Sequence, residues 1–233
     1  MRQSTESQSP TVATIFSSVT IETTLPVHPY EPLENRKAIK TKRLLIRPLK
    51  PSDLEDLHAL RSQPEVAAWS SKGKPNESID ITRLELEEGL SRDVYQFAIC
   101  LSNGEMIGIG GSHRRQGNLG WPVIGYAIRH ETWGNGYANE FLAAFLDRWW
   151  SLPREAVTIP VEKSTVRGDG PIKDERIVAT TTNKNTASQK VMTKNGMELN
   201  RIWDEDDWSR PGQKVTMYGY IAKPHVEDAE PTP

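Results

Sequence analysis

One junction constrains the fold of this chain more than any other feature, because a strand pattern turns there directly into a long amphipathic helix. Residues 121–128 read WPVIGYAI and residues 130–142 read HETWGNGYANEFL, with Gly134 and Gly136 between the two patterns. Apolar side chains then recur along one stripe over residues 136–151, which is typical of a helix that buries one face. The core of the domain therefore contains a strand, a glycine turn and a helix in immediate succession.

Apolar periodicity predicts further strands and helices on both sides of this junction. Strands are expected over residues 43–49, 95–101, 106–109, 121–128, 176–182, 197–203 and 214–222. Helices are expected over residues 52–61, 79–90, 136–151 and 186–195. Asn103 and Gly104 favour a tight hairpin turn between two of the strands. Early strands followed by a strand-helix-strand unit indicate an α+β fold with a mixed sheet.

The chain has 233 residues, enough for one domain with extensions. Residues 1–38 are rich in Ser, Thr, Pro and Glu without apolar periodicity, so we expect a disordered polar tail rather than the alternative, a transit peptide. The ordered domain is expected over 39–223 and a second disordered tail over 224–233. Within the domain, residues 152–175 form a long insertion that either borders an acceptor site or is disordered.

Composition excludes several classes of protein. The 29 Lys and Arg residues are balanced by 31 Asp and Glu residues, for a net charge of -2, which argues against a nucleic-acid partner. No apolar run approaches the roughly 18 residues that a membrane-spanning helix needs, so no membrane partner is expected. Cys100 is the single cysteine. It excludes an internal disulfide and a multi-cysteine zinc site, and it favours a reducing compartment, hence the cytoplasm. No metal is expected.

The glycine turn has the chemistry of an anion site. Glycine lets the backbone approach a ligand closely, and the N–H groups in the first turn of a helix point at negative oxygens. A pyrophosphate fits such a turn. A plain tight turn is the alternative when the G-x-G spacing is taken alone.

Together with its neighbours, this turn resembles the GNAT N-acetyltransferases, and within them the RimJ/RimL branch of ribosomal-protein alanine acetyltransferases. The resemblance covers nearly all of residues 39–223. It is carried by the opening strand KTKRLLIRPLKPSD, by the strand VIGYAI and by the W-G-x-G-Y-A element at 133–138. An N-x-x-S motif follows at 185–188, before a short helix that ends in a K-x-G turn at 194–196.

The resemblance implies a GNAT fold, in which a mixed and mostly antiparallel sheet is splayed between its fourth and fifth strands and flanked by helices. Acetyl-CoA would lie in this V as the co-substrate. The turn that would hold its pyrophosphate comprises Trp133, Gly134, Asn135, Gly136, Tyr137 and Ala138. The pantetheine arm would pair with Tyr126, Ala127 and Ile128 and would contact Asn185.

Acetyl transfer from a thioester to an amine needs a proton for the departing thiolate. Related enzymes often supply it from a tyrosine on the late helix, at the position where this chain has Met192. A similar serine serves in the RimJ/RimL branch, so Ser188 becomes the candidate acid. The alternative is that its hydroxyl caps the helix or only contacts CoA.

The transfer also needs a group that removes a proton from the amine. The branch frequently places a glutamate where this chain has Val123, so that carry-over fails. His113, at the end of the third strand, becomes the candidate base because an imidazole suits proton removal at neutral pH. A packed or surface histidine with only a structural role is the alternative, and Glu131, Tyr218 or ordered water are other routes.

The resemblance thus implies an acetyl-CoA-dependent N-acetyltransferase in which a primary amine attacks the thioester directly within a ternary complex. The acceptor would be a protein N-terminus or a small-molecule amine. The acidic run at 204–207 either attracts a cationic amine or forms a solvated turn. The second hypothesis, motivated by Met192 and Val123, is a catalytically silent CoA-binding module that regulates a partner. A monomer or a homodimer is expected.

Overall fold

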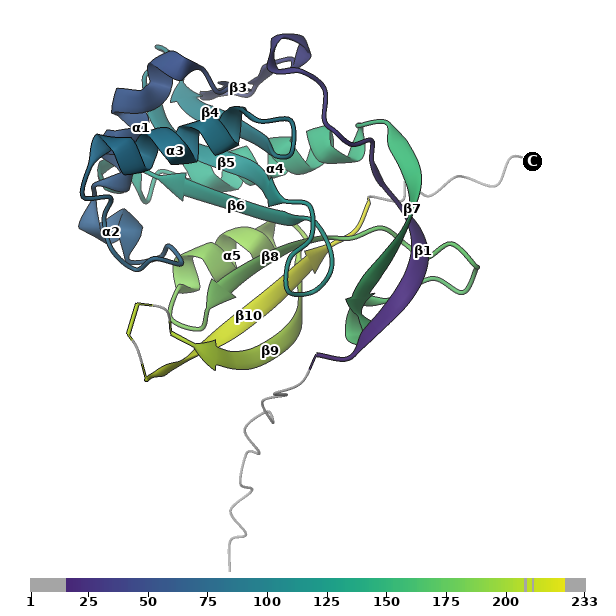
Figure 1. Ribbon diagram of the computed structural model, residues 1–233. Helices are drawn as coiled ribbons and strands as arrows, with labels where there is room; N and C mark the ends of the chain where they lie inside the picture. Colours follow the sequence, from purple (N-terminus) through teal and green to yellow (C-terminus); the bar gives the residue numbers. More distant parts are fainter. Residues whose placement is uncertain (1–15, 208, 211, 225–233) are drawn as a thin grey trace, which may run out of the picture.

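The computed structural model describes residues 16–207, 209–210 and 212–224, which form two sheets with helices on both faces of the larger one (Figure 1). The larger sheet has the strand order β2-β3-β4-β5-β6-β8-β10-β9. Its strands are β2 (Ile39–Lys40), β3 (Leu44–Pro48), β4 (Tyr95–Leu101), β5 (Met106–Arg114), β6 (Val123–Ile128), β8 (Ile177–Thr182), β9 (Glu198–Asp206) and β10 (Lys214–Ala222). All neighbours run antiparallel except β6 and β8, which run parallel. The expected α+β fold with a mixed, mostly antiparallel sheet is confirmed.

The helices lie in two layers. They are α1 (Leu54–Arg61), α2 (Pro64–Ala67), α3 (Ile79–Leu90), α4 (Tyr137–Trp150) and α5 (Thr186–Lys194), with short 3-10 turns at Leu33–Asn35, Pro51–Asp53, His130–Thr132 and Lys163–Thr165. Within the described chain, no helix has both the length and the apolar character needed to cross a membrane.

Alternating side chains of β4 build a separate core on each face of the sheet. Phe97 and Ile99 pack into the cluster that contains Phe141 and Phe145 of α4. Ala98 and Cys100 pack into the other cluster, with Leu57, Leu60 and Leu86 of α1 and α3. Successive residues of a strand point to opposite faces, so the sheet separates the α4 and α5 layer from the α1 and α3 layer.

The predicted elements are confirmed with small shifts at their ends. The helix predicted over 79–90 matches α3 at both ends, and the helices predicted over 136–151 and 186–195 match α4 and α5 to within one residue. The predicted hairpin is formed by β4 and β5.

The expectation of a disordered segment over 1–38 is wrong for its described part. β1 (Ser18–Pro26) pairs along its full length with β7 (Arg154–Glu162) to form the second, antiparallel sheet. Ile21, Thr23 and Leu25 are buried at every second position. This alternation is difficult to recognise in the sequence, because Thr23, one of the buried positions, is polar. Residues 1–15 and 225–233, parts of the two expected tails, lie outside the described residues.

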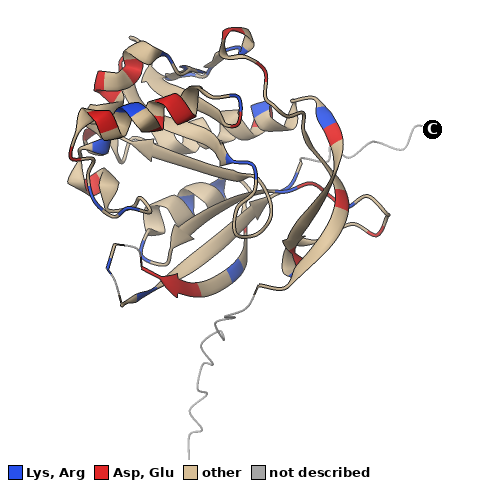
Figure 2. Cartoon of the chain, in the orientation of Figure 1, with Lys and Arg blue, Asp and Glu red and all other residues tan. Residues whose placement is uncertain are grey.

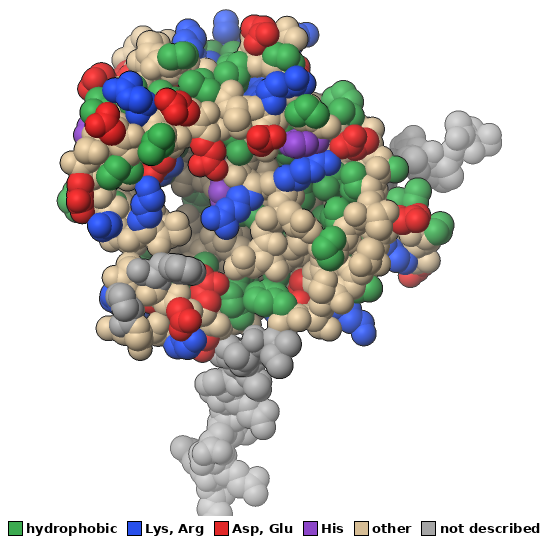
Figure 3. All heavy atoms as spheres, in the orientation of Figure 1, with side chains coloured by type: hydrophobic (Ala, Val, Ile, Leu, Met, Phe, Trp, Pro, Cys, Tyr) green, Lys and Arg blue, Asp and Glu red, His purple; other side chains and the backbone are tan. Residues whose placement is uncertain are grey.

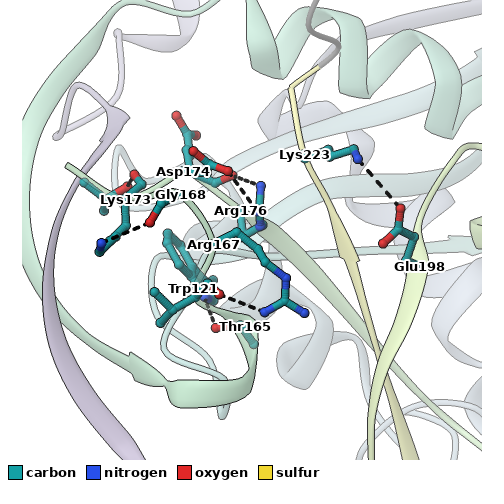
Figure 4. Close-up of polar contacts among 12 residues, drawn as sticks. Trp121, Thr165, Arg167, Gly168, Lys173, Asp174, Arg176, Glu198 and Lys223 are labelled. Atoms are coloured by element: carbon teal, nitrogen blue, oxygen red, sulfur yellow. Dashed lines mark hydrogen bonds and ion pairs between the residues drawn. The ribbon is translucent and has the colours of Figure 1, made fainter. Parts of the chain in front are cut away.

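The same pairing corrects the hypothesis that the insertion 152–175 is disordered, because β7 occupies much of it. Its later part is also anchored. Trp121 Nε1 donates a hydrogen bond of 2.7 Å to Thr165 Oγ1 (Figure 4), and Ile172 forms a parallel bridge with Glu22 of β1. The two added strands share an apolar cluster with Trp121, Val123 and Val178, so they brace the closed ends of β6 and β8.

We expect Leu25→Ala to lower the free energy of unfolding by about 3 kcal/mol, because it removes a fully enclosed side chain and leaves a cavity. Leu25 is 1% exposed, whereas the nearby Val27 is 43% exposed. Val27→Ala is therefore the matched control, with an expected change below about 0.5 kcal/mol. Urea unfolding of both variants measures the difference. Equal stabilities would show that β1 contributes nothing to the core.

Candidate active site

The sheet opens between its two parallel strands. Val123 and Val178 form the pairing that links β6 to β8 in the described chain, supported by a 2.9 Å bond from Val178 N–H to the Pro122 carbonyl. The opposite edge of β6 is paired with β5 as far as Ile128. Beyond Val123 the strands diverge, and Figure 3 shows a hollow over this region between α2 and α5. The edge of β6 thus presents backbone donors and acceptors to an extended ligand.

The glycine turn lies at the open end of β6. Gly134 and Gly136 both have a φ of 78°, a conformation that glycine adopts without strain. A Cβ atom built on Gly134 would meet no described heavy atom within 4 Å, and one on Gly136 would meet only Arg43, at 3.6 Å. The first helical hydrogen bond runs from Glu140 N–H to the Gly136 carbonyl, at 3.1 Å. The N–H groups before Glu140 thus form an open cradle that fits a phosphate group.

Trp133 holds the backbone that joins the end of β6 to the glycine turn. Its Nε1 donates a 2.7 Å hydrogen bond to the Ile128 carbonyl, and its ring packs edge-on against His130 with the ring centroids 4.8 Å apart. The carbonyl of Ile128 is thereby engaged by the indole. The Pro122 carbonyl faces β8, whereas the Arg129 N–H faces Ile107 of β5. Because strand residues alternate between the two edges, Tyr126 turns its backbone groups to the open edge, whereas Ala127 turns its own to β5.

Asn185 and Ser188 lie at the start of α5. The side-chain Oδ1 of Asn185 accepts a 3.1 Å hydrogen bond from Ser188 N–H, so Asn185 is the residue that caps the helix. The hydroxyl of Ser188 does not act as that cap. It accepts a 3.3 Å hydrogen bond from the Tyr126 hydroxyl on β6. The hydroxyl hydrogen of Ser188 is then available to another acceptor.

Tyr126 connects β6 to α5 across the opening between β6 and β8. Its ring packs against Phe141 of α4, with the centroids 6.1 Å apart. Burial raises the pKa of Tyr126 to about 12, so the phenol keeps its proton at neutral pH. The sequence pointed to the backbone of Tyr126 alone, because nothing local in VIGYAI indicates a partner 62 positions away.

His113 lies on the opposite face of β6. The register of β5 and β6 shifts between Ser112 and Arg114, which leaves His113 as the extra residue of a bulge. A Cβ on Gly125 would lie 3.1 Å from the imidazole Cε1, so only the absence of a side chain there lets the ring lie against the strand. Gly125 and Tyr126 are successive residues, so His113 and Ser188 approach β6 from opposite faces.

Burial weakens His113 as a base. Desolvation, followed by the positive charges of Arg114 and Arg61, lowers its pKa from 6.5 to about 4. The imidazole is therefore neutral at physiological pH, which is the form that accepts a proton.

A model of a known protein family matches the sequence that builds this site. The sequence model of the acetyltransferase (GNAT) domain matches residues 43–198, more than half of the 233-residue chain. The chain belongs to the GNAT acetyltransferase family. Membership makes the protein an N-acetyltransferase, as the sequence motifs had indicated. Among curated proteins, none matches the chain.

Solved GNAT structures share the fold. A GNAT-family acetyltransferase from Bacillus anthracis is 22% identical, with a TM-score of 0.60 over 80% of this chain and 98% of that one. Spermidine N-acetyltransferase from Vibrio cholerae, solved with CoA and spermine, is 16% identical, with a TM-score of 0.58 over 78% and 96%. A Vibrio cholerae protein described as a ribosomal-protein-serine acetyltransferase is 15% identical, with a TM-score of 0.54 over 80% and 98%.

This GNAT protein has apolar residues at the two family positions that the sequence marked as altered. Met192 and Val123 are 2% and 6% exposed and belong to apolar clusters. Tyr218, one of the other proton routes, packs against the cluster on the α4 and α5 face. Glu131 is exposed beside the glycine turn and accepts a 2.8 Å hydrogen bond from Gln63.

The acidic run lies at the end of β9 (Figure 2) and is largely engaged within its own hairpin. Asp206 pairs with Lys214 at 2.5 Å, and Asp207 pairs with Arg210 at 2.7 Å. Asp204 and Glu205 have neutral donors instead, since Asp204 accepts a 2.7 Å hydrogen bond from the Thr216 hydroxyl and Glu205 accepts one of 2.9 Å from the indole of Trp203. Any attraction of the run for a cationic acceptor therefore rests mainly on the charges of Asp204 and Glu205.

Two cavities lie outside the V. One of about 560 Å³ runs between β2 and α4, lined by Ile39, Lys40, Thr41, Glu140, Ala143, Ala144, Asp147, Arg148 and Ser151. The other, of about 260 Å³, lies near the start of β8, where Arg176 pairs with Asp174 at 3.3 Å and Lys223 with Glu198 at 3.9 Å (Figure 4). Neither is lined by a residue expected to bind the cofactor or to catalyse. Within the described ranges, no three His, Cys, Asp or Glu side chains gather as a metal site.

The desolvation of His113 predicts a pH dependence of stability. The unfolded chain binds a proton at this residue below about pH 6.5, whereas the folded chain binds it only near the native pKa of about 4. The free energy of unfolding should therefore fall as the pH drops from 6.5 towards 4, and His113→Gln should remove that part of the slope. Imidazole resonances of His113 that titrate near pH 6.5 would contradict this.

Proposed function

We propose that this GNAT protein transfers the acetyl group of acetyl-CoA to a primary amine, on a protein N-terminus or a small molecule, by direct attack within a ternary complex. The observation that carries the proposal is the unpaired edge of β6, which leads directly into the open glycine cradle of α4. Acetyl-CoA matches both parts of the site. Its extended arm carries amides that can pair with a strand edge, and its pyrophosphate follows along the molecule and can bind in the cradle. The motifs that resemble the RimJ/RimL branch agree with this proposal, which includes a reducing, cytoplasmic location.

The chain's own residues would hold the cofactor without a cluster of basic side chains. Backbone groups of Tyr126, which face the open edge, would pair with the arm as an added strand does. The N–H groups at 134–138 meet the pyrophosphate, with the dipole of α4 behind them. Asn185, fixed as the cap of α5, contacts the arm from the other side of the V. When bound, acetyl-CoA supplies an activated acetyl thioester.

In the transfer step, the amine nitrogen bonds to the carbonyl carbon and the carbon–sulfur bond breaks. Ser188 donates its hydroxyl proton to the departing sulfur and regains a proton from solvent. Tyr126, which stays protonated, keeps its hydrogen bond to Ser188 Oγ and so stabilises the negative charge that develops on that oxygen.

The proton lost by the amine leaves on the other face of β6. His113 is neutral and accepts the hydrogen bond of the incoming amine. With a pKa of about 4, it passes the proton to water rather than retaining it. Positioning of the two reactants supplies much of the remaining rate.

The first experiment is calorimetric titration with acetyl-CoA, followed by thiol release with a panel of amines. We expect one site per chain and acetyl-CoA-dependent thiol release with at least one primary amine. The panel contains spermidine and a short peptide with a free N-terminus, so that the two acceptor classes are separated. Binding without release for any amine would favour the catalytically silent CoA-binding module. Absence of binding by the folded protein would contradict the proposal.

We expect Ser188→Ala to lower kcat by about 100-fold and to change the Kd of acetyl-CoA less than about twofold, because the hydroxyl acts on the leaving group. Tyr126→Phe, which removes only the hydrogen bond to Ser188, should lower kcat by about fivefold. The control is Ser102→Ala, in the exposed turn between β4 and β5. Unchanged turnover of Ser188→Ala would exclude the acid role.

A further inference from the structure

Arg43, just before β3, reaches the glycine turn from a distant part of the chain. Its NH1 donates a 2.8 Å hydrogen bond to the Asn135 carbonyl, and its guanidinium lies over the Tyr137 ring, 4.8 Å from the centroid. Its NH2 is the atom that a Cβ on Gly136 would meet at 3.6 Å. One side chain therefore contacts Asn135 and Tyr137 and lies beside Gly136 between them.

Glu140, in the first turn of α4, fixes this arginine. Arg43 Nε donates to Glu140 Oε2 at 2.6 Å, and Arg43 N–H donates to Oε1 at 2.8 Å. The hydroxyl of Thr41 donates to the same Oε1 at 2.6 Å. Burial alone raises the pKa of Glu140, but the hydrogen bonds from Thr41 and Arg43 outweigh it and leave the pKa below its ordinary value. The carboxylate therefore stays charged and tied to the β2–β3 hairpin.

The contact with Asn135 orients the peptide group that joins it to Gly136. In a trans peptide the carbonyl and the following N–H point in opposite directions. Because the Asn135 carbonyl points to Arg43, the N–H of Gly136 points away from the arginine. Glycine at φ 78° has no side chain to hold this geometry, so the peptide would rotate more freely without an external partner.

We propose that Arg43, held by Glu140, is a positioning residue that clamps the glycine turn in the form that binds the pyrophosphate of CoA. This inference rests on the proposed function, since it concerns the same cofactor. It assigns the opening strand a role at the cofactor site. It also makes the affinity for CoA depend on a carboxylate, which a purely electrostatic view of a phosphate site would not predict.

Glu140→Gln can strengthen or weaken the binding of CoA, and the direction of this change distinguishes the clamp from a purely electrostatic effect of the carboxylate. This change removes a negative charge beside the turn. If the charge near the phosphates is what matters, the variant should bind CoA more tightly. If Glu140 acts by fixing Arg43, the variant should bind CoA more weakly, by about fivefold.

The test is calorimetric titration of CoA into the full-length wild type, Glu140→Gln, Arg43→Ala and Arg43→Lys, with thermal melts to confirm folding. We expect Arg43→Ala to raise the Kd by about tenfold. Arg43→Lys should also weaken binding, because an ammonium keeps the charge but cannot reach the Asn135 carbonyl and Glu140 with a planar fork. Arg83→Ala, an exposed arginine paired with Asp80 on α3, is the matched control.

Each outcome decides the proposal. Weaker binding by both Glu140→Gln and Arg43→Lys supports the clamp. Tighter binding by Glu140→Gln, or wild-type affinity in folded Arg43→Ala, overturns it while leaving the proposed function intact. Absence of CoA binding by the wild type would contradict the proposed function, and the clamp with it.

Discussion

The parallel pairing of β6 with β8 is the constraint on which the site depends. Parallel strands need a long crossover, and this chain uses α4 for it and then inserts β7 before β8. Since the strands pair through Val123 and Val178, no other described strand covers the rest of β6 on that side. The crossover helix must start at the open end of β6, which brings the glycine turn to the mouth of the V. The backbone that would hold an extended cofactor therefore follows from the topology, and side chains refine it.

The two faces of β6 separate the groups proposed for the two proton transfers. On the α5 face, the Tyr126 and Ser188 hydroxyls meet at 3.3 Å, where a departing thiolate would need a donor. On the other face, the bulge in β5 lays His113 against Gly125. A glycine at 125 admits the ring, and a tyrosine at 126 reaches the helix, so two successive residues place the proposed acid and the proposed base on opposite sides. The arrangement agrees with an amine and a thioester that approach the strand from different faces.

Much of this fold could be predicted from the sequence, and the exceptions have physical causes. Local periodicity was sufficient to predict the helices α3 and α4. It also predicted the β4–β5 hairpin, because these two strands follow each other in the chain. β1 was not predicted, because its partner β7 lies more than a hundred residues away and half of its positions are polar. At the site, the glycine turn was visible in the sequence, whereas the low pKa of His113 arises from burial and from Arg61 on a different element. Arg43 was missed because its contacts with Asn135 and Glu140 span more than ninety positions.

Amide chemical shifts of the isotope-labelled protein, recorded during titration with acetyl-CoA, test the central claim most directly. The claim is that the open edge of β6 and the turn before α4 together hold the cofactor. We expect saturable shifts concentrated in two stretches, 124–128 and 134–139, with small changes in β1 and β7. Shifts confined to other elements, such as the cavity between β2 and the middle of α4, would contradict the claim and place the cofactor elsewhere.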